Sequence, residues 1–128
     1  MTNREYLSQA LNLQKEIDQL NSELSDGYVS PQLAQERVQK TGGNAAEANA
    51  IRQVILHEKI SKLIAEKMRL LIKITYTIDK VEDAQMRLLL HKRYIQGERV
   101  RDIAAVMHYE RESMFRLLRQ AEEMITQP

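Results

Sequence analysis

The chain has 128 residues, with 19 Lys and Arg against 18 Asp and Glu, a formal net charge of +1, and no cysteine. This length fits one domain, or a small module with a helical extension, and the lack of cysteine excludes disulfides and cysteine-based zinc sites. No apolar run approaches the roughly 18 residues of a membrane span, and no signal peptide is evident, so we expect a cytoplasmic protein with no membrane partner. Only two prolines and four glycines interrupt a sequence rich in helix formers, which predicts an all-α fold.

A first helix is predicted over residues 3–26, and a second over residues 45–81, separated by a linker over residues 27–44. Apolar side chains in both helices recur at alternating spacings of four and three, which is typical of the a and d positions of a coiled coil. The two seams pair either within the chain, as a long antiparallel hairpin, or between chains, with a homodimer as the favoured oligomer. The positions predicted to oligomerise are Leu13, Ile17, Leu20, Leu24, Ile60, Ile64, Leu71, Ile74 and Ile78.

Three further helices are predicted in the last third of the chain, over residues 84–95, 100–107 and 110–125. The last two have the pattern of a helix-turn-helix, in which a small residue lets the second helix cross the first closely; Ala104 and Ala105 provide it. The side chains expected to face inward are Val100, Ile103, Val106, Met107, Met114, Leu117, Leu118 and Ala121. Tyr109 is expected to anchor the core, whereas Phe115 either packs in a core or interface, or contacts a thymine methyl group.

The remaining face of the last helix carries polar residues, several with long side chains, as a helix that contacts DNA bases requires. Residues 84–119 hold eight Arg and Lys against four Asp and Glu, whereas residues 1–83 hold 11 against 12, so positive charge gathers near this motif. The residues predicted to read bases are Arg111, Glu112, Ser113 and Arg116. Those predicted to hold DNA phosphates are Lys92, Arg99, Arg101 and Arg119.

The segment from Met86 to Gly97, followed by Asp102-Ile103-Ala104, resembles region four of bacterial sigma factors. That family has leucines, an Arg-Tyr pair, a glycine, an acidic-Ile-Ala triplet, and a recognition helix that opens with Arg-Glu. The likeness covers roughly residues 83–124. It implies that residues 110–125 enter the major groove of a promoter element, with Arg111, Glu112 and Arg116 at the base-reading positions.

Two positions depart from the pattern of sigma region four. His108 stands where that family has a glycine in the turn, and histidine adopts a left-handed backbone less readily than glycine. Glu110 stands where Ser or Thr caps the recognition helix, and it is a poorer side-chain cap than either.

The layout of the whole chain is similar to that of small phage late-transcription regulators of the ArpU/RinA type. These proteins place a coiled-coil region before a sigma-like helix-turn-helix, and Tyr6-Leu7-Ser8-Gln9-Ala10 with Lys15-Glu16-Ile17 carries the likeness at the amino end. It implies a phage- or prophage-encoded activator of late genes in the cytoplasm of a bacterial host.

The predicted organisation is therefore a coiled-coil and oligomerisation region over residues 1–82 and a helix-turn-helix DNA-binding domain over residues 83–128. The leading hypothesis is a sequence-specific regulator that binds double-stranded DNA. The alternatives are a protein-interaction module that docks on RNA polymerase or another regulator, and a small terminase-like DNA-packaging protein. We expect no enzyme activity, cofactor or metal site, because His57, His91 and His108 lie on different predicted elements and no catalytic arrangement can be proposed from spacing.

Overall fold

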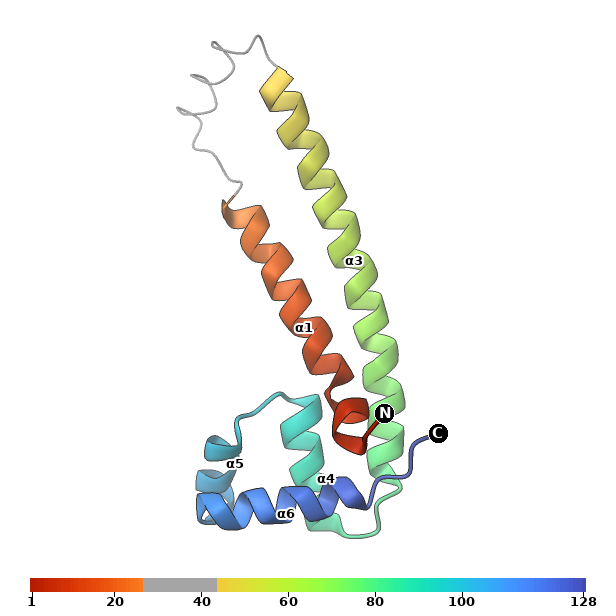
Figure 1. Cartoon of the computed structure of the whole chain (residues 1–128), viewed down its shortest axis with the longest axis vertical. Coiled ribbons are helices and arrows are strands. Elements are labelled where there is room, and N and C mark those ends of the chain that lie inside the picture. Colours follow the sequence, from red (N-terminus) through yellow and green to blue (C-terminus); the bar gives the residue numbers. More distant parts are fainter. Residues whose placement is uncertain (27–43) are drawn as a thin grey trace. The chain divides into compact units, whose positions relative to one another are not determined.

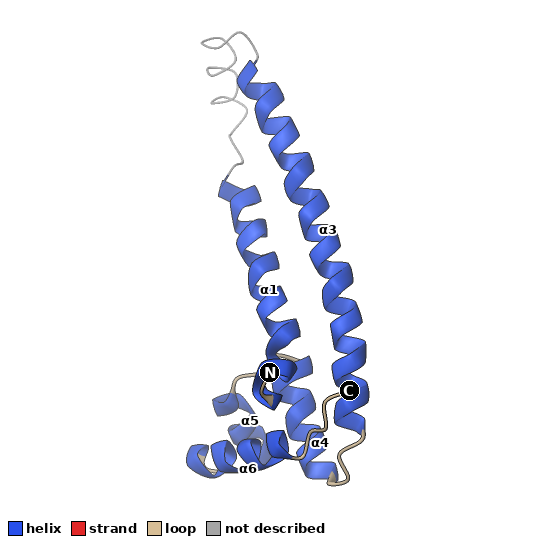
Figure 2. Ribbon diagram, turned by 45° about the vertical axis from the view of Figure 1, so that its right-hand side comes forward, coloured by secondary structure: helices blue, strands red, loops and turns tan. Residues whose placement is uncertain are grey.

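A computed structural model describes residues 1–26 and 44–128 of the chain. The described residues contain helices and no strand (Figure 2), which confirms the predicted all-α fold. The elements in chain order, shown in Figure 1, are α1 (Asn3–Asp26), α3 (Asn44–Asp79), α4 (Ala84–Leu90), η1 (His91–Ile95), α5 (Val100–Met107) and α6 (Arg111–Glu123).

The helix boundaries agree with the prediction to within about two residues, with one difference in kind. The segment over residues 84–95 is not one α-helix, because α4 passes at His91 into η1, a turn of π-helix. The Gln96 N–H donates to the His91 carbonyl oxygen over 3.0 Å, five residues back, where an α-helix would pair four residues apart. The predicted linker over residues 27–44 falls outside the described residues, except for its last residue, Asn44, which begins α3.

The chain divides into two compact units, and both long helices contribute to each. Unit 1 comprises residues 1–13 and 67–128, and unit 2 comprises residues 14–66. The predicted functional division between residues 82 and 83 stays a prediction, but it does not coincide with the packing, since the unit that contains α5 and α6 also includes 1–13 and 67–82.

The core of unit 1 explains why these flanking segments belong to it. Tyr6, Leu7 and Ala10 of α1 are buried with Ile74 and Ile78 of α3 in the same apolar cluster as the helix-turn-helix. The other buried members of this cluster are Val81, Leu89, Leu90, Tyr94, Val100, Ile103, Ala104, Met114, Leu118, Ala121 and Ile125. The ends of the two long helices thus enlarge the apolar core on which the shorter helices pack, and a larger core favours stability in so small a unit.

A buried polar cluster ties the start of α1 to the end of α6 within unit 1. The Glu122 side chain is buried, accepts a hydrogen bond from the Tyr94 hydroxyl, and lies 3.2 Å from Nη2 of Arg4. Asn3 Nδ2 also donates to the carbonyl oxygens of Glu122 and Ile125, over 2.9 and 3.0 Å. Burial, followed by the bond to Glu122, raises the pKa of the Tyr94 hydroxyl, which therefore remains a donor to this carboxylate.

Local capping sets where two of the unit 1 helices begin. The Thr2 hydroxyl accepts from the Glu5 N–H and the Glu5 carboxylate accepts from the Thr2 N–H, each over 3.1 Å, which is a capping box. Asp83 caps α4 by accepting from the Met86 N–H over 2.9 Å. Both caps satisfy backbone donors that the helix itself leaves without a partner.

The residues predicted to oligomerise differ in how much of each side chain is exposed to solvent in the single chain. Ile17 and Ile60 are buried in unit 2, and Ile74 and Ile78 are buried in unit 1. Leu13, Leu20, Leu24 and Leu71 are half-buried. Ile64 is 46% exposed. Packing within the chain therefore accounts for much of both seams, and a role for these residues between chains stays a prediction.

Substitution Leu7→Ala tests whether α1 completes the core that carries α6. Leu7 is fully buried, so we expect the substitution to lower the free energy of unfolding by about 2–5 kcal/mol. Hydrogen exchange of the α6 amides should accelerate accordingly. Leu88→Ala, at an exposed leucine of α4, is the control and should cost less than about 0.5 kcal/mol. Unchanged α6 exchange in the Leu7 variant would show that the first helix does not support this unit.

Candidate nucleic-acid interface

The turn between α5 and α6 has the left-handed residue that a tight helix-turn-helix needs. His108 ends α5 at φ 60° and ψ 40°, and the Tyr109 N–H bonds to the Ala104 carbonyl oxygen over 2.9 Å. Among the described non-glycine residues, His108 alone has a positive φ. Histidine thus takes the conformation expected of glycine, at a cost in strain that the packing of the two helices must offset.

α6 packs against both α4 and α5, and its buried face is Met114, Leu118 and Ala121. On α5 the buried face is Val100, Ile103 and Ala104. Ala104 is the small residue at this contact, whereas Ala105 is exposed. The predicted inward face is therefore confirmed for most of its residues.

Two predictions of burial are wrong. Val106 is 63% exposed, because at about 3.6 residues per turn it lies about 120° around the helix from Val100 and so off the face that Val100 and Ala104 bury. Tyr109 is 38% exposed and accepts a hydrogen bond from the Gln85 side chain, since it follows the turn and lies outside both helices.

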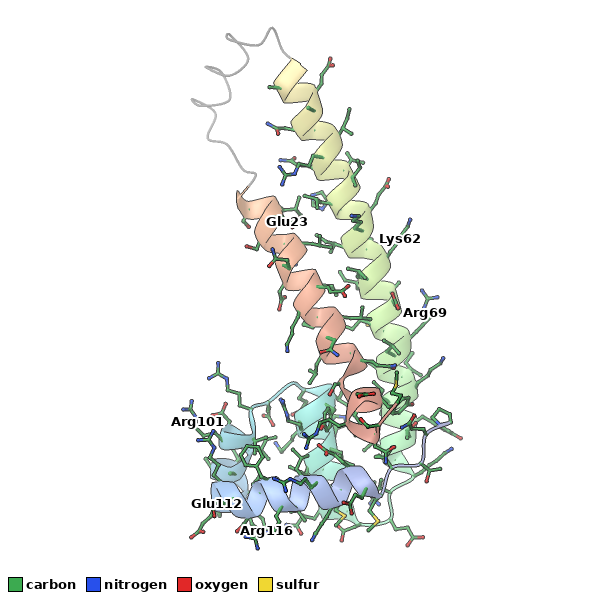
Figure 3. All side chains as sticks on the ribbon, in the orientation of Figure 1. Glu23, Lys62, Arg69, Arg101, Glu112 and Arg116 are labelled. Atoms are coloured by element: carbon green, nitrogen blue, oxygen red, sulfur yellow. The ribbon has the colours of Figure 1, made fainter. Side chains whose placement is uncertain are left out.

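The face of α6 opposite its buried residues is charged and exposed. Figure 3 shows Glu112 and Arg116 pointing away from the helix, and both are exposed, as is Arg119. Ser113 is half-buried, and its base-reading role stays a prediction. Arg111 is exposed but turns toward the Phe115 ring, with its Cζ atom 5.9 Å from the ring centre.

A hollow of about 340 Å³, here called the arginine basin, lies beside the start of α6. It is lined by Arg93, Arg99, Val100, Arg101, Arg111 and Phe115. Four arginine residues therefore line one concave surface, and none of the described residues that line it is acidic. Arg101 is also visible in Figure 3, where it projects from α5.

The two other residues predicted to hold phosphates lie elsewhere in unit 1. Lys92 is mostly buried, and its Nζ lies 3.6 Å from Glu98 Oε2. Arg119 lines a second hollow together with Arg4 and the acidic Glu122 and Glu123. Neighbouring carboxylates weaken the attraction of both cations for an anion, and their phosphate roles stay predictions.

The helices that meet at this surface have no side-chain cap at their amino ends. Neither Arg99, the N-cap residue of α5, nor Glu110, the N-cap residue of α6, makes a capping hydrogen bond through its side chain. Glu110, which stands where sigma region four has Ser or Thr, therefore does not cap α6 through its side chain. Backbone N–H groups that no side chain caps, together with the helix dipole, favour negative charge nearby.

Sequence reasoning assigned Arg93 no functional role, and it left Phe115 either in a core or interface or in contact with a thymine methyl group, whereas both residues line the basin. Arg93 belongs to η1, where its Nη1 donates to the Glu98 carbonyl oxygen over 3.1 Å. A spacing argument for a regular helix over residues 84–95 misplaces side chains in a π-turn, because each residue there advances by a smaller angle. The Arg-rich run at residues 99–101 was the available signal that a cationic surface forms here.

Within the described residues, no three His, Asp or Glu side chains gather in a way that could hold a metal ion. None of the described helices combines the length and the apolar character that a membrane crossing requires.

The model of a protein family described as "Protein of unknown function (DUF1492)" matches residues 27–126. The chain belongs to this family. The DUF1492 match includes all of α3 to α6, and so contains the helix-turn-helix and the arginine basin, but not α1. No curated protein and no solved structure matches the chain.

Substitution Ala104→Leu tests the close contact between α5 and α6. Ala104 is buried at 4% exposure, so added carbon atoms should force the helices apart and lower the free energy of unfolding by about 1–3 kcal/mol. Ala105→Leu, at the exposed neighbour, should change it by less than about 0.5 kcal/mol. Chemical denaturation followed by circular dichroism measures both. Equal effects of the two substitutions would argue against a close helix crossing at Ala104.

Proposed function

We propose that the protein is a sequence-specific, double-stranded-DNA-binding transcription regulator that inserts α6 into the major groove. The observation that carries the proposal is the two-faced character of α6. Its apolar face is buried on α4 and α5, while Glu112 and Arg116 are exposed on the other side. An exposed recognition helix on a short helical support is how helix-turn-helix proteins reach base edges.

The chemistry of the exposed face supports base reading. An arginine can donate two parallel hydrogen bonds to guanine, and a glutamate can accept from the amino group of cytosine. Arg116 and Glu112 are four residues apart on one helical face, so they can reach neighbouring base pairs. The arginine basin beside them provides positive charge toward the DNA backbone.

The biological setting extends this proposal. The likeness to sigma region four and to ArpU/RinA-type regulators supports a phage- or prophage-encoded activator of late genes. Such a protein would act in the cytoplasm of the bacterial host, with RNA polymerase as a second partner.

In vitro selection from random duplexes, followed by binding measurements at fixed salt, tests the DNA proposal. We expect the wild-type protein to enrich a defined site. Arg116→Ala should relax the preference at one base pair, at a cost of roughly 1–3 kcal/mol for the preferred base. Arg52→Ala, which removes one charge from an exposed position of α3, is the matched control and should keep the preference. Selection that enriches no site would refute the proposal.

We also propose that the protein works as a homo-oligomer, with a dimer favoured. α3 carries large apolar side chains that the single chain leaves exposed in both units, which supports a surface for a second copy. In unit 2 they include Ile51, Val54, Ile55 and Ile64, and in unit 1 they include Met68, Ile72 and Tyr76. Exposed apolar surface of this kind is frequently an interaction site.

Light scattering of the full chain tests the oligomer. Ile64→Glu places a charge at an exposed position of the predicted seam, so we expect the dimer mass to fall toward that of a monomer. Gln53→Glu introduces the same charge at an exposed polar position of α3 and should leave the mass unchanged. A wild-type protein that is monomeric at all concentrations would contradict the oligomer. A dimer that Ile64→Glu leaves intact would exclude Ile64 from its interface.

A further inference from the structure

We propose that the arginine basin is a phosphate-binding site in which Arg93 and Arg111 act together with Arg99 and Arg101. The proposal deepens the proposed DNA-binding function and rests on it for one source of the phosphate, the DNA backbone. Under this proposal Arg93, for which the sequence predicts no role, binds phosphate. Arg111, which the sequence predicts to read bases, binds phosphate instead.

The four arginines of the basin come together from parts of the chain that are separate in sequence. They come from three separate elements, since Arg93 belongs to η1, Arg99 and Arg101 flank the start of α5, and Arg111 begins α6. The hollow that they share has a volume of about 340 Å³. Four like charges on the residues around one hollow repel each other, and an anion in the hollow would relieve that repulsion.

The surroundings of these groups leave their charge largely uncompensated. Of these four arginines, Arg101 has its Nε 4.0 Å from Asp102 Oδ1, and both side chains are exposed, where ion pairs contribute little. Arg93 donates to the backbone carbonyl oxygen of Glu98, and this neutral acceptor does not cancel the charge of the arginine. The uncapped amino end of α5, at Val100 and Arg101, adds the positive end of a helix dipole on the same side.

The chemistry of guanidinium selects the ligand class. Its planar fork of N–H donors matches two oxygens of a phosphate, and such charge-assisted pairs are stronger than neutral hydrogen bonds. Four arginines around one hollow suit a tetrahedral anion with several oxygens better than a carboxylate with two. The phosphate can belong to a DNA strand or to a free phosphorylated molecule.

Phe115 explains why Arg111 belongs to the basin. The Arg111 Cζ atom lies 5.9 Å from the centre of the ring, and the ring itself lines the hollow at 39% exposure. A cation held over an aromatic face loses freedom of motion and some hydration. Arg111 is thereby held beside the ring that lines the basin, while Glu112 and Arg116 are exposed on the face of α6 opposite its buried residues.

The experiment uses the full chain and two probes, inorganic pyrophosphate by titration calorimetry and duplex DNA of random sequence across a salt series. The test variant is Arg93→Gln with Arg111→Gln, and the matched control is Arg52→Gln with Arg69→Gln, which removes the same charge from α3. We expect saturable pyrophosphate binding in the wild type and the control, and its loss in the test variant. The slope of log Kobs against log salt should become shallower by about 1 in the test variant only.

The two arms separate the sources of the phosphate. A shallower DNA slope in the test variant supports the site with the DNA backbone as the source. If the test variant loses pyrophosphate binding while its slope is unchanged, the site is supported with a free phosphorylated molecule as the ligand. The same conclusion holds if the protein binds no DNA at all, and that result would in addition refute the proposed DNA-binding function. If the wild type does not bind pyrophosphate and the slopes are equal, the basin is not a phosphate site, even where selection still enriches a DNA sequence.

A folding check accompanies the test because Arg93 also bonds to a backbone carbonyl. Should the double variant lose its helical circular dichroism, Arg111→Gln alone replaces it, since the described contact of Arg111 is with an exposed ring. The same two readouts then decide the proposal.

Discussion

Burial of Met114, Leu118 and Ala121 against α4 and α5 fixes which side chains of α6 face solvent. A helix of this length has one stripe that can be buried, so the opposite stripe is fixed as soon as the first is packed. Glu112, Arg116 and Arg119 are exposed for that reason, and the left-handed turn at His108 fixes how α5 leads into α6. The proposed interface is thus a consequence of core packing. Any change that loosens the core should also make the positions of the charged side chains of α6 less well defined.

The support of this motif extends beyond the motif itself. Leu7 of α1 and Ile74 of α3 are fully buried in the same core as the helix-turn-helix. Polar contacts at the carboxyl-terminal end of α6 add to this support, because Tyr94 and Arg4 both contact the buried Glu122 carboxylate. A buried charge with its partners in place specifies one arrangement, while loss of one partner is costly. Unit 1 therefore combines the charged helix α6 with a scaffold assembled from residues 1–13 and 67–128.

The sequence predicts the helices well, because capping, glycine placement and apolar periodicity are local signals. It also predicts the buried faces of α5 and α6, apart from Val106, whose apolar character says nothing about the direction in which it points. The contribution of Leu7 to the core of unit 1 could not be predicted, because Leu7 lies off the four-three spacing that runs through Leu13 and Ile17. The arginine basin could not be assembled from spacing either, since Arg93 lies in a π-turn and its neighbours come from separate elements. Periodicity reports faces of helices, whereas a site depends on how those faces meet.

The most direct test of the central idea is an NMR titration of the full chain with duplex DNA carrying its selected site, following backbone amide and arginine side-chain signals. The exposed face of α6 and the start of α5 should shift together and saturably, while signals of the exposed face of α3 in unit 2 stay unchanged. Saturable shifts confined to α3, with the signals of Glu112 and Arg116 unaffected, would contradict the account. They would mean that the charged face of α6 is solvated surface and that recognition takes place on another part of the protein.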